Sequence, residues 1–140
     1  MIYLFAGDRN NAWAGFLRAR FVRSLSEGTS SARSTFQQVI ARVSDAELFS
    51  RLIVITNAEF RFVVAEQLRD RGIAADIVLE PMRRDSGPAV AVSAVLASER
   101  DASAFVLVLA ADHVIGKLDE FRSACRIAAQ TAAKAPIYVN

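Results

Sequence analysis

Three polar corners interrupt the apolar runs of this 140-residue sequence, each where a predicted strand ends. Gly7 follows the first apolar run, Glu80 follows the third and Asp112 follows the fourth. In open parallel sheets, ligands bind beyond the carboxyl ends of the strands, near the point where the strand order reverses. We therefore expect these three residues to lie along one edge of a sheet, around a ligand.

The corner after Glu80, in the stretch LEPMRRDSGPAVAV, is the richest in polar groups. Asp85 or Ser86 can cap the helix that follows, and Pro88 fits its first turn. Capping explains the turn but leaves Glu80 and Arg84 unexplained. A carboxylate at a strand end can accept two hydrogen bonds from adjacent N–H donors of a base, such as guanine N1 and N2. Arg84 and the backbone N–H groups of the turn would complete a pocket for base or ribose.

The corner at Asp112 follows the most apolar run of the sequence, in FVLVLAADHVIG. A carboxylate held at the end of a buried strand suits Mg²⁺, which prefers hard oxygen ligands and keeps waters for substrate phosphates. The alternative is that Asp112 caps a turn or helix. The neighbouring His113 is interpreted as a packed or hydrogen-bonded side chain rather than a base.

Apolar runs that alternate with helical patterns must position these corners. The predicted strands are Ile2–Ala6, Leu52–Thr56, Ala75–Leu79, Ala104–Ala110 and Ile137–Val139. The predicted helices are Thr35–Val43, a segment capped by Asn57 and ended by Gly72, Pro88–Ser98 and Leu118–Ala133. Residues 8–34 are expected to be irregular, with a helical turn around Trp13–Phe21. Continuously apolar strands are typical of sheets covered on both faces, so the sequence predicts an α/β, Rossmann-like, mainly parallel sheet in the order 3-2-1-4.

Composition excludes several classes of function. The formal net charge of +2, with no Lys/Arg run longer than Arg83-Arg84, argues against nucleic acid as a partner. No apolar run approaches the ~20 residues that a membrane-spanning helix needs. Cys125 is the single cysteine, and its apolar neighbours indicate a buried side chain rather than a metal ligand. A cytoplasmic protein is expected.

Beyond the fold pattern, the segment from about Thr35 to Ala133 resembles the bacterial mannose-1-phosphate guanylyltransferases. In that family a strand and N-x-E-x-R-F-x-V-A-E-Q-L-R precede L-E-P-x-x-R-N-T-A-P-A, and a strand ending in P-A-D-H-x-I follows. The chain reads NAEFRFVVAEQLR, LEPMRRDSGPA and AADHVI at the same positions and in the same order. The resemblance implies an enzyme of polysaccharide biosynthesis that converts GTP and mannose 1-phosphate to GDP-mannose and pyrophosphate with Mg²⁺.

The resemblance implies a role for each matching corner. Asp112 stands where the family binds its catalytic Mg²⁺, and Glu80, Arg84 and Pro88 stand in the element that lies along the nucleotide. Asp85, Ser86 and Gly87 replace the family's Asn, Thr and Ala. Asp85 in place of Asn adds a negative charge and removes amide donors, which is expected to weaken GTP binding.

The N-terminal segment departs further from the family, whose loop G-G-x-G-T-R-L-W-P is followed by a Pro-Lys pair. Aligned on Trp13, the chain keeps Gly7, but Arg9 stands at a glycine position and Asn11 replaces the arginine. With one extra residue allowed, Arg23 takes the place of the catalytic lysine. Loss of one such transition-state contact typically costs about 3–4 kcal/mol.

We therefore expect residues 1–140 to form a single partial nucleotidyltransferase-like domain with weak or no activity as an isolated chain. The alternatives are a catalytically silent nucleotide-binding or subunit-interaction module, and an α/β remnant without a ligand. Family members continue into strands that bind the sugar phosphate, and this sequence ends at Asn140. The run Ala104–Ala110 is expected to be left as an apolar edge, which favours self-association over cover by Ile137–Val139.

Overall fold

Strands and helices alternate along the chain, as the sequence predicts. A computed structural model describes residues 14–18, 33–82, 86–110 and 115–134. The strands are β1 (Ala14–Arg18), β2 (Leu52–Asn57), β3 (Ala75–Glu80) and β4 (Val106–Ala110). The helices are α1 (Thr35–Arg42), α2 (Arg61–Arg69), α3 (Ser86–Arg100) and α4 (Leu118–Ala132).

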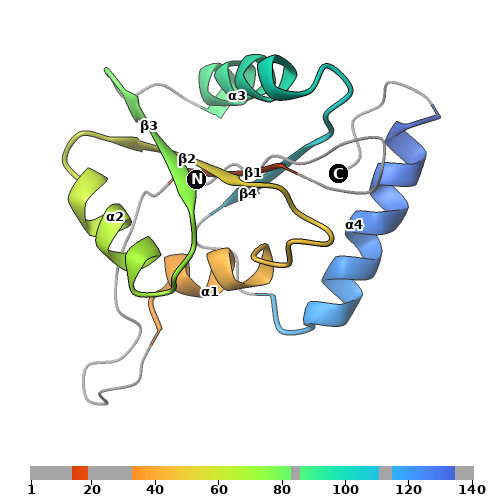
Figure 1. The fold of residues 1–140 in the computed structure, drawn as a ribbon, viewed down its shortest axis with the longest axis horizontal. Helices are drawn as coiled ribbons and strands as arrows, with labels where there is room; N and C mark the ends of the chain where they lie inside the picture. The colour runs from red at the N-terminus through yellow and green to blue at the C-terminus, as the bar shows by residue number, and fades with distance from the viewer. Residues whose placement is uncertain (1–13, 19–32, 83–85, 111–114, 135–140) are drawn as a thin grey trace.

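The four strands form one sheet in the order β3-β2-β1-β4, and every neighbouring pair is parallel. Helices cover both faces: α3 lies on one face, and α1 and α2 lie on the other (Figure 1). The chain crosses the sheet one way from β1 to β3 and back from β3 to β4, so crossovers of one hand place α3 opposite α1 and α2. The predicted α/β fold class is confirmed, and the observed order reads 3-2-1-4 with Ala14–Arg18 as the first strand.

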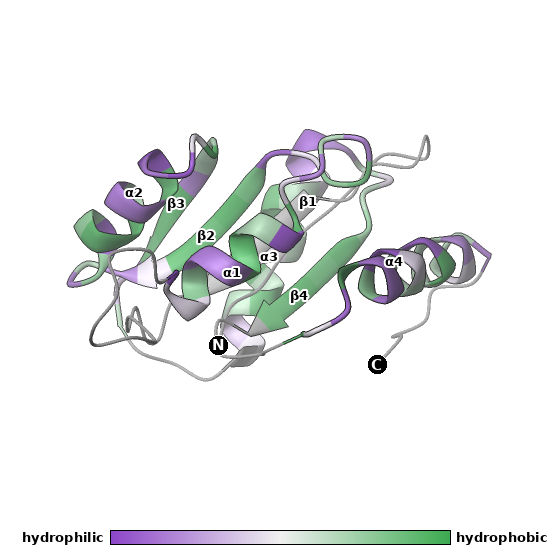
Figure 2. Cartoon of the chain, turned by 90° about the horizontal axis from the view of Figure 1, so that it is seen from below, coloured by the Kyte–Doolittle hydropathy of each residue, from purple (hydrophilic) through white to green (hydrophobic). Residues whose placement is uncertain are grey.

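α4 lies beyond β4, at the opposite end of the sheet from α2 (Figure 2). Its inner face carries Cys125, which is buried, with Phe121 and Ala128 packed against the core. Nη2 of Arg122 lies 3.6 Å from Oδ2 of Asp45, in the connection between α1 and β2. This pair ties α4 to the α1 side of the molecule.

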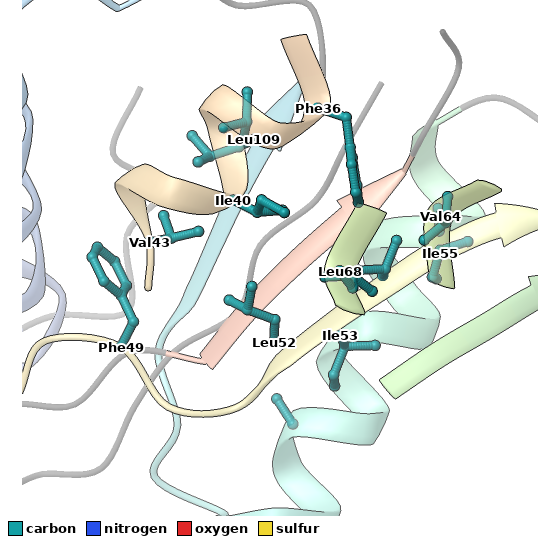
Figure 3. Close-up of a cluster of buried hydrophobic side chains, with 14 of the residues drawn as sticks. Phe36, Ile40, Val43, Phe49, Leu52, Ile53, Ile55, Val64, Leu68 and Leu109 are labelled. Carbon is teal, nitrogen blue, oxygen red and sulfur yellow. The ribbon is translucent and has the colours of Figure 1, made fainter. Parts of the chain in front are cut away.

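The main core lies between α1, α2 and the sheet (Figure 3). The spacing of Phe36, Val39, Ile40 and Val43 puts all four on one face of α1, and all four are buried. Residues Leu52 to Thr56 of β2 are buried in succession, which explains why this strand is apolar without alternation. Val64 and Leu68 of α2 and Leu109 of β4 belong to the same cluster.

Local signals set the ends of two helices. The hydroxyl of Ser34 accepts a hydrogen bond from the N–H of Gln37 at 3.0 Å, and the Gln37 side chain accepts from the N–H of Ser34 at 3.2 Å, which forms a capping box. Gly72 follows α2 with φ at +63°, where the N–H of Ile73 reaches back to the carbonyl of Leu68 at 3.1 Å. The predicted end of this helix at Gly72 is confirmed.

The central strand is not the segment that the sequence predicts. Residues 14–18 pair with both β2 and β4, where a helical turn around Trp13–Phe21 is expected. This part of the prediction is wrong, because a five-residue run that contains Gly15 has little strand propensity of its own. Hydrogen bonding on both sides compensates for the weak local preference. The run Ile2–Ala6, predicted to be the first strand, lies outside the described residues.

α3 is only half covered, whereas the sequence predicts a buried helix. Its inner face is a stripe of small residues, Ala89, Ser93 and Ala97, all buried. Val92 and Val95 on the outer face are 44% and 56% exposed. The prediction is wrong for the outer face because uniform hydrophobicity carries no signal about which side meets the sheet.

No helix among the residues that the structure describes is long and apolar enough to cross a membrane.

Candidate functional site

The carboxyl ends of all four strands lie at one edge of the sheet because every pairing is parallel. Arg18 at the end of β1 pairs with Ile55 and with Ala110, the last residue of β4. Asn57, the last residue of β2, pairs with Glu80, the last residue of β3. β2 and β3 therefore end together, two residues beyond the ends of β1 and β4. We call this edge the step: the ends of β2 and β3, which carry Asn57 and Glu80, extend beyond the ends of β1 and β4.

Glu80 stands at the outer end of this step and is half-buried. Alternation along β3 puts its side chain on the same face as that of Asp76, which forms an ion pair with Arg100 near the end of α3. The carboxylate therefore belongs to the α3 face of the sheet, at the edge where α3 begins. Glu80 is thus the last residue of a strand, as the sequence predicts.

Asn57 stands beside Glu80 in the register and belongs to the same face. Its Oδ1 accepts a hydrogen bond from the backbone N–H of Phe60 at 3.2 Å, and its Nδ2 donates to Oε2 of Glu59 at 3.2 Å. The first contact shapes the turn that leads into α2. The prediction that Asn57 caps this helix is wrong, because the cap position is Phe60, three residues later, and no side chain makes a capping hydrogen bond there. Only the strand register shows that Asn57 lies next to Glu80.

α3 begins at the same edge. Ser86 is its first residue and Pro88 its third, so the missing N–H of Pro88 removes no intrahelical bond. The prediction that Pro88 lies in the first turn is confirmed. Gly87 and Pro88 are exposed, and a Cβ added at Gly87 would meet no atom within 4 Å. The first turn of this 15-residue helix, whose N–H groups have no partner within the helix itself, begins near the end of β3.

Several predicted site residues lie outside the described part of the chain: Gly7, Arg23, Arg84, Asp85 and Asp112. The structure places Glu80 and Pro88, and the backbone of Ser86, at one edge. In chain order, Gly7 precedes the observed β1, and the segment that leaves the carboxyl end of β1 is residues 19–32, which contains Arg23. Within the described ranges, no three His, Cys, Asp or Glu side chains gather closely enough to hold a metal ion.

A family model described as nucleotidyl transferase matches residues 28–139, which include the step and the helices around it. The chain belongs to the nucleotidyl transferase family. A mannose-1-phosphate guanylyltransferase of Sinorhizobium fredii (strain NBRC 101917 / NGR234) is 40% identical over 137 residues, which are 94% of this chain and 26% of that protein. A mannose-1-phosphate guanylyltransferase of Escherichia coli is 42% identical over 100 residues, covering 71% of this chain and 21% of its own.

A third relative of this nucleotidyl transferase chain, a putative mannose-1-phosphate guanylyltransferase of Vibrio cholerae, is 36% identical over 132 residues. That match covers 94% of the chain and 28% of the relative. The chain thus spans about a quarter of the length of the relatives that it matches. No solved structure gives a significant match.

Proposed function

We propose that the step at the carboxyl edge binds GTP for a transfer of the mannose-1-phosphate guanylyltransferase type, in which GTP and mannose 1-phosphate give GDP-mannose and pyrophosphate. The observation that carries the proposal is the placement of Glu80 beside Asn57 at the edge where α3 begins. The strand order also reverses between β1 and β4, the position at which open α/β sheets bind nucleotides. The names of the relatives supply the substrate class.

Each candidate residue has a distinct part in this proposal. Glu80 accepts hydrogen bonds from N1 and N2 of guanine, and Arg84, Asp85, Ser86 and Pro88 form the wall along base and ribose. The N-terminal turn of α3 offers backbone N–H groups to a negatively charged or acceptor group of the nucleotide.

The phosphates need positive charge, which the proposal assigns to the segment that leaves β1. Arg23 in this segment neutralises charge on the reacting phosphate as the sugar phosphate oxygen attacks the α-phosphorus in line. Gly7 belongs to the loop that resembles the family's phosphate loop, although it precedes the observed β1.

The metal is assigned to Asp112. This residue follows, by two positions in the sequence, the last residue of β4, the strand beside which the strand order reverses. A carboxylate there fits Mg²⁺, which binds through one or two carboxylates and completes its shell with phosphate oxygens and waters. Bound Mg²⁺ would screen the charge of the triphosphate, while Asp112 holds it at the strand end.

One GTP titration of the 140-residue chain, with and without Mg²⁺, tests the binding step. We expect Mg²⁺-dependent binding, with a stabilisation of about 2.7 kcal/mol at a ligand concentration of 100 Kd. Asp112→Asn should remove the dependence on Mg²⁺. Glu80→Gln should weaken GTP more than ATP, because adenine lacks the two adjacent donors. The matched control is Glu99→Gln, an exposed carboxylate near the far end of α3. Equal losses for both nucleotides would contradict the guanine assignment.

The second candidate function, a catalytically silent nucleotide-binding or subunit-interaction module, is favoured by Arg9 and Asn11 in the phosphate loop. Turnover with mannose 1-phosphate separates it from a weak enzyme. If the loop aligns as the resemblance implies, Arg9→Gly with Asn11→Arg should tighten GTP binding. If instead the segment after β1 contacts the phosphates, the double change should leave GTP affinity unchanged and Arg23→Ala should weaken GTP binding.

The remaining assignments belong to the same proposal. The chain is one partial domain that acts in the cytoplasm, in polysaccharide biosynthesis, on a nucleotide and a sugar 1-phosphate rather than on nucleic acid. It also self-associates through the outer edge of β4, which pairs with no strand of the described part of the chain.

A further inference from the structure

We propose that Asn57 is a specificity residue that donates a hydrogen bond to O6 of guanine, beside the carboxylate of Glu80. The inference rests on the proposed function, because it names a second reader of the same base. Three facts carry it: the shared register of Asn57 and Glu80, the fixed orientation of the Asn57 amide, and the order of polar groups along guanine.

The amide of Asn57 is held in one orientation by two hydrogen bonds. Its Oδ1 accepts from the N–H of Phe60, and its Nδ2 donates to the carboxylate of Glu59, both at 3.2 Å. A flip of the amide would set Nδ2 against the N–H donor and Oδ1 against the carboxylate, so both contacts would become repulsive. The orientation therefore follows from the surroundings.

Because Oδ1 of Asn57 accepts from the N–H of Phe60, the group that this amide presents to a ligand is the Nδ2 donor. Nδ2 carries two N–H groups, and the contact with Glu59 uses one of them. Among the residues that the structure describes, no acceptor faces the second N–H, which lies at the half-buried end of β2 and can donate to a ligand. Asn57 therefore favours a ligand group that accepts, and it disfavours an amino group at the same place.

Glu80 supplies the opposite preference one strand away. Asn57 and Glu80 are register partners on neighbouring parallel strands, which lie about 4.8 Å apart. The step thus has a carboxylate, which accepts, next to an amide that donates. Guanine carries N2–H and N1–H donors followed by the O6 acceptor, which matches that order. Adenine carries an amino group where guanine has O6, and its N1 is an acceptor.

The test compares the binding of GTP, ITP and ATP to the unaltered chain and to Asn57→Asp. The aspartate keeps an oxygen for the N–H of Phe60, but it has no N–H to donate. We expect GTP affinity to fall about tenfold or more, the loss of one good hydrogen bond at a buried ligand edge. ITP, which keeps O6 and lacks the N2 amine, should fall by the same factor as GTP. ATP should be unchanged or bind more tightly.

Asn57→Ala is the second variant, because the new charge in Asn57→Asp lies near Glu59 and Glu80. It should weaken GTP and ITP equally and leave ATP unchanged. Glu80→Gln should affect GTP more than ITP, since only GTP presents both donors. Gln130→Glu, an exposed amide near the end of α4, is the matched control and should change no affinity.

Two kinds of failure are distinguishable. If Glu80→Gln selectively weakens GTP while the Asn57 variants do not, the proposed function stands and the role of Asn57 is refuted. Equal losses of GTP and ATP in both Asn57 variants would also refute it, because they would indicate a structural role at the start of α2. If the unaltered chain binds no GTP, the proposed function and the role of Asn57 fall together.

Discussion

Cys125 packs on the inner face of α4, and burial raises the pKa of its thiol from 9.0 to about 11, with Arg126 opposing the shift. In the unfolded chain the thiol ionises near pH 9. Below that pH the thiol is protonated in both states and contributes no pH dependence. Between pH 9 and 11 unfolding releases a proton, so the free energy of unfolding falls as the pH rises.

We therefore predict that Cys125→Ala loses this part of the pH dependence. The alanine leaves a small cavity, so the variant should be less stable than the unaltered chain below pH 9, and the difference should shrink between pH 9 and 11. Urea unfolding at closely spaced pH values measures both curves. A difference that stays constant across that range would show that the thiol ionises as readily in the folded chain as in the unfolded one.

The positions of single residues were predictable where they follow a strand. Glu80 and Pro88 lie at the sheet edge expected for them, because a carboxylate after an apolar run and a proline after a capping turn are local signals. Asn57 was not predictable as a partner of Glu80. Its spacing from α2 indicates a capping residue, whereas its position beside Glu80 depends on strand register, which local sequence does not encode.

α3 meets the sheet through small side chains, with Ala89, Ser93 and Ala97 one turn apart. We predict that Ala97→Leu destabilises the chain by about 1–3 kcal/mol, because the larger side chain has to force the helix away from the sheet. Ala94→Leu is the matched control on the exposed face of the same helix and should change stability little. Denaturant unfolding of both variants measures the difference, and equal effects would show that the inner face tolerates added volume.

The bounds of helices and strands were predictable where the hydrophobic periodicity of a segment and its length indicate the same kind of element. Three strands and all four helices lie within a few residues of their expected bounds. β1 was missed because its residues, AGFLR, form a strand only through pairing on both sides. The inner face of α3 was also not predictable, since valines lie all round the helix and the small residues that contact the sheet give no hydrophobic signal.

At the scale of the whole molecule, β4 is the outermost described strand of the sheet, on the side away from β3. β4 pairs with β1 on one side, and no strand of the described part of the chain pairs with its other side. Its residues are VLVLA, and Val108 is 36% exposed. An apolar edge with unpaired N–H and C=O groups favours pairing with another chain. We predict that sedimentation across a concentration series shows self-association.

Two neighbouring proline variants test whether β4 carries that association. Adjacent residues direct their N–H groups to opposite sides of a strand, so one of Val106→Pro and Leu107→Pro removes an outward donor and the other removes a donor to β1. The variant that removes the outward donor should dissociate the assembly and keep the fold. The variant that removes the donor to β1 should destabilise the chain. A concentration-independent monomer in the unaltered chain would contradict the prediction and leave the edge covered by residues outside the described part, such as Ile137–Val139.

The position of β1 between β2 and β4 also sets the order in which the sheet assembles. β2 and β3 pair residues about twenty positions apart, whereas β1 and β4 pair residues about ninety positions apart. Closing the longer loop costs more chain entropy, and its contacts form later. Amide protection during refolding should therefore develop in β2 and β3 before β4. The paired ends of β2 and β3, with Asn57 and Glu80, would then exist before β4 has joined the sheet beside β1.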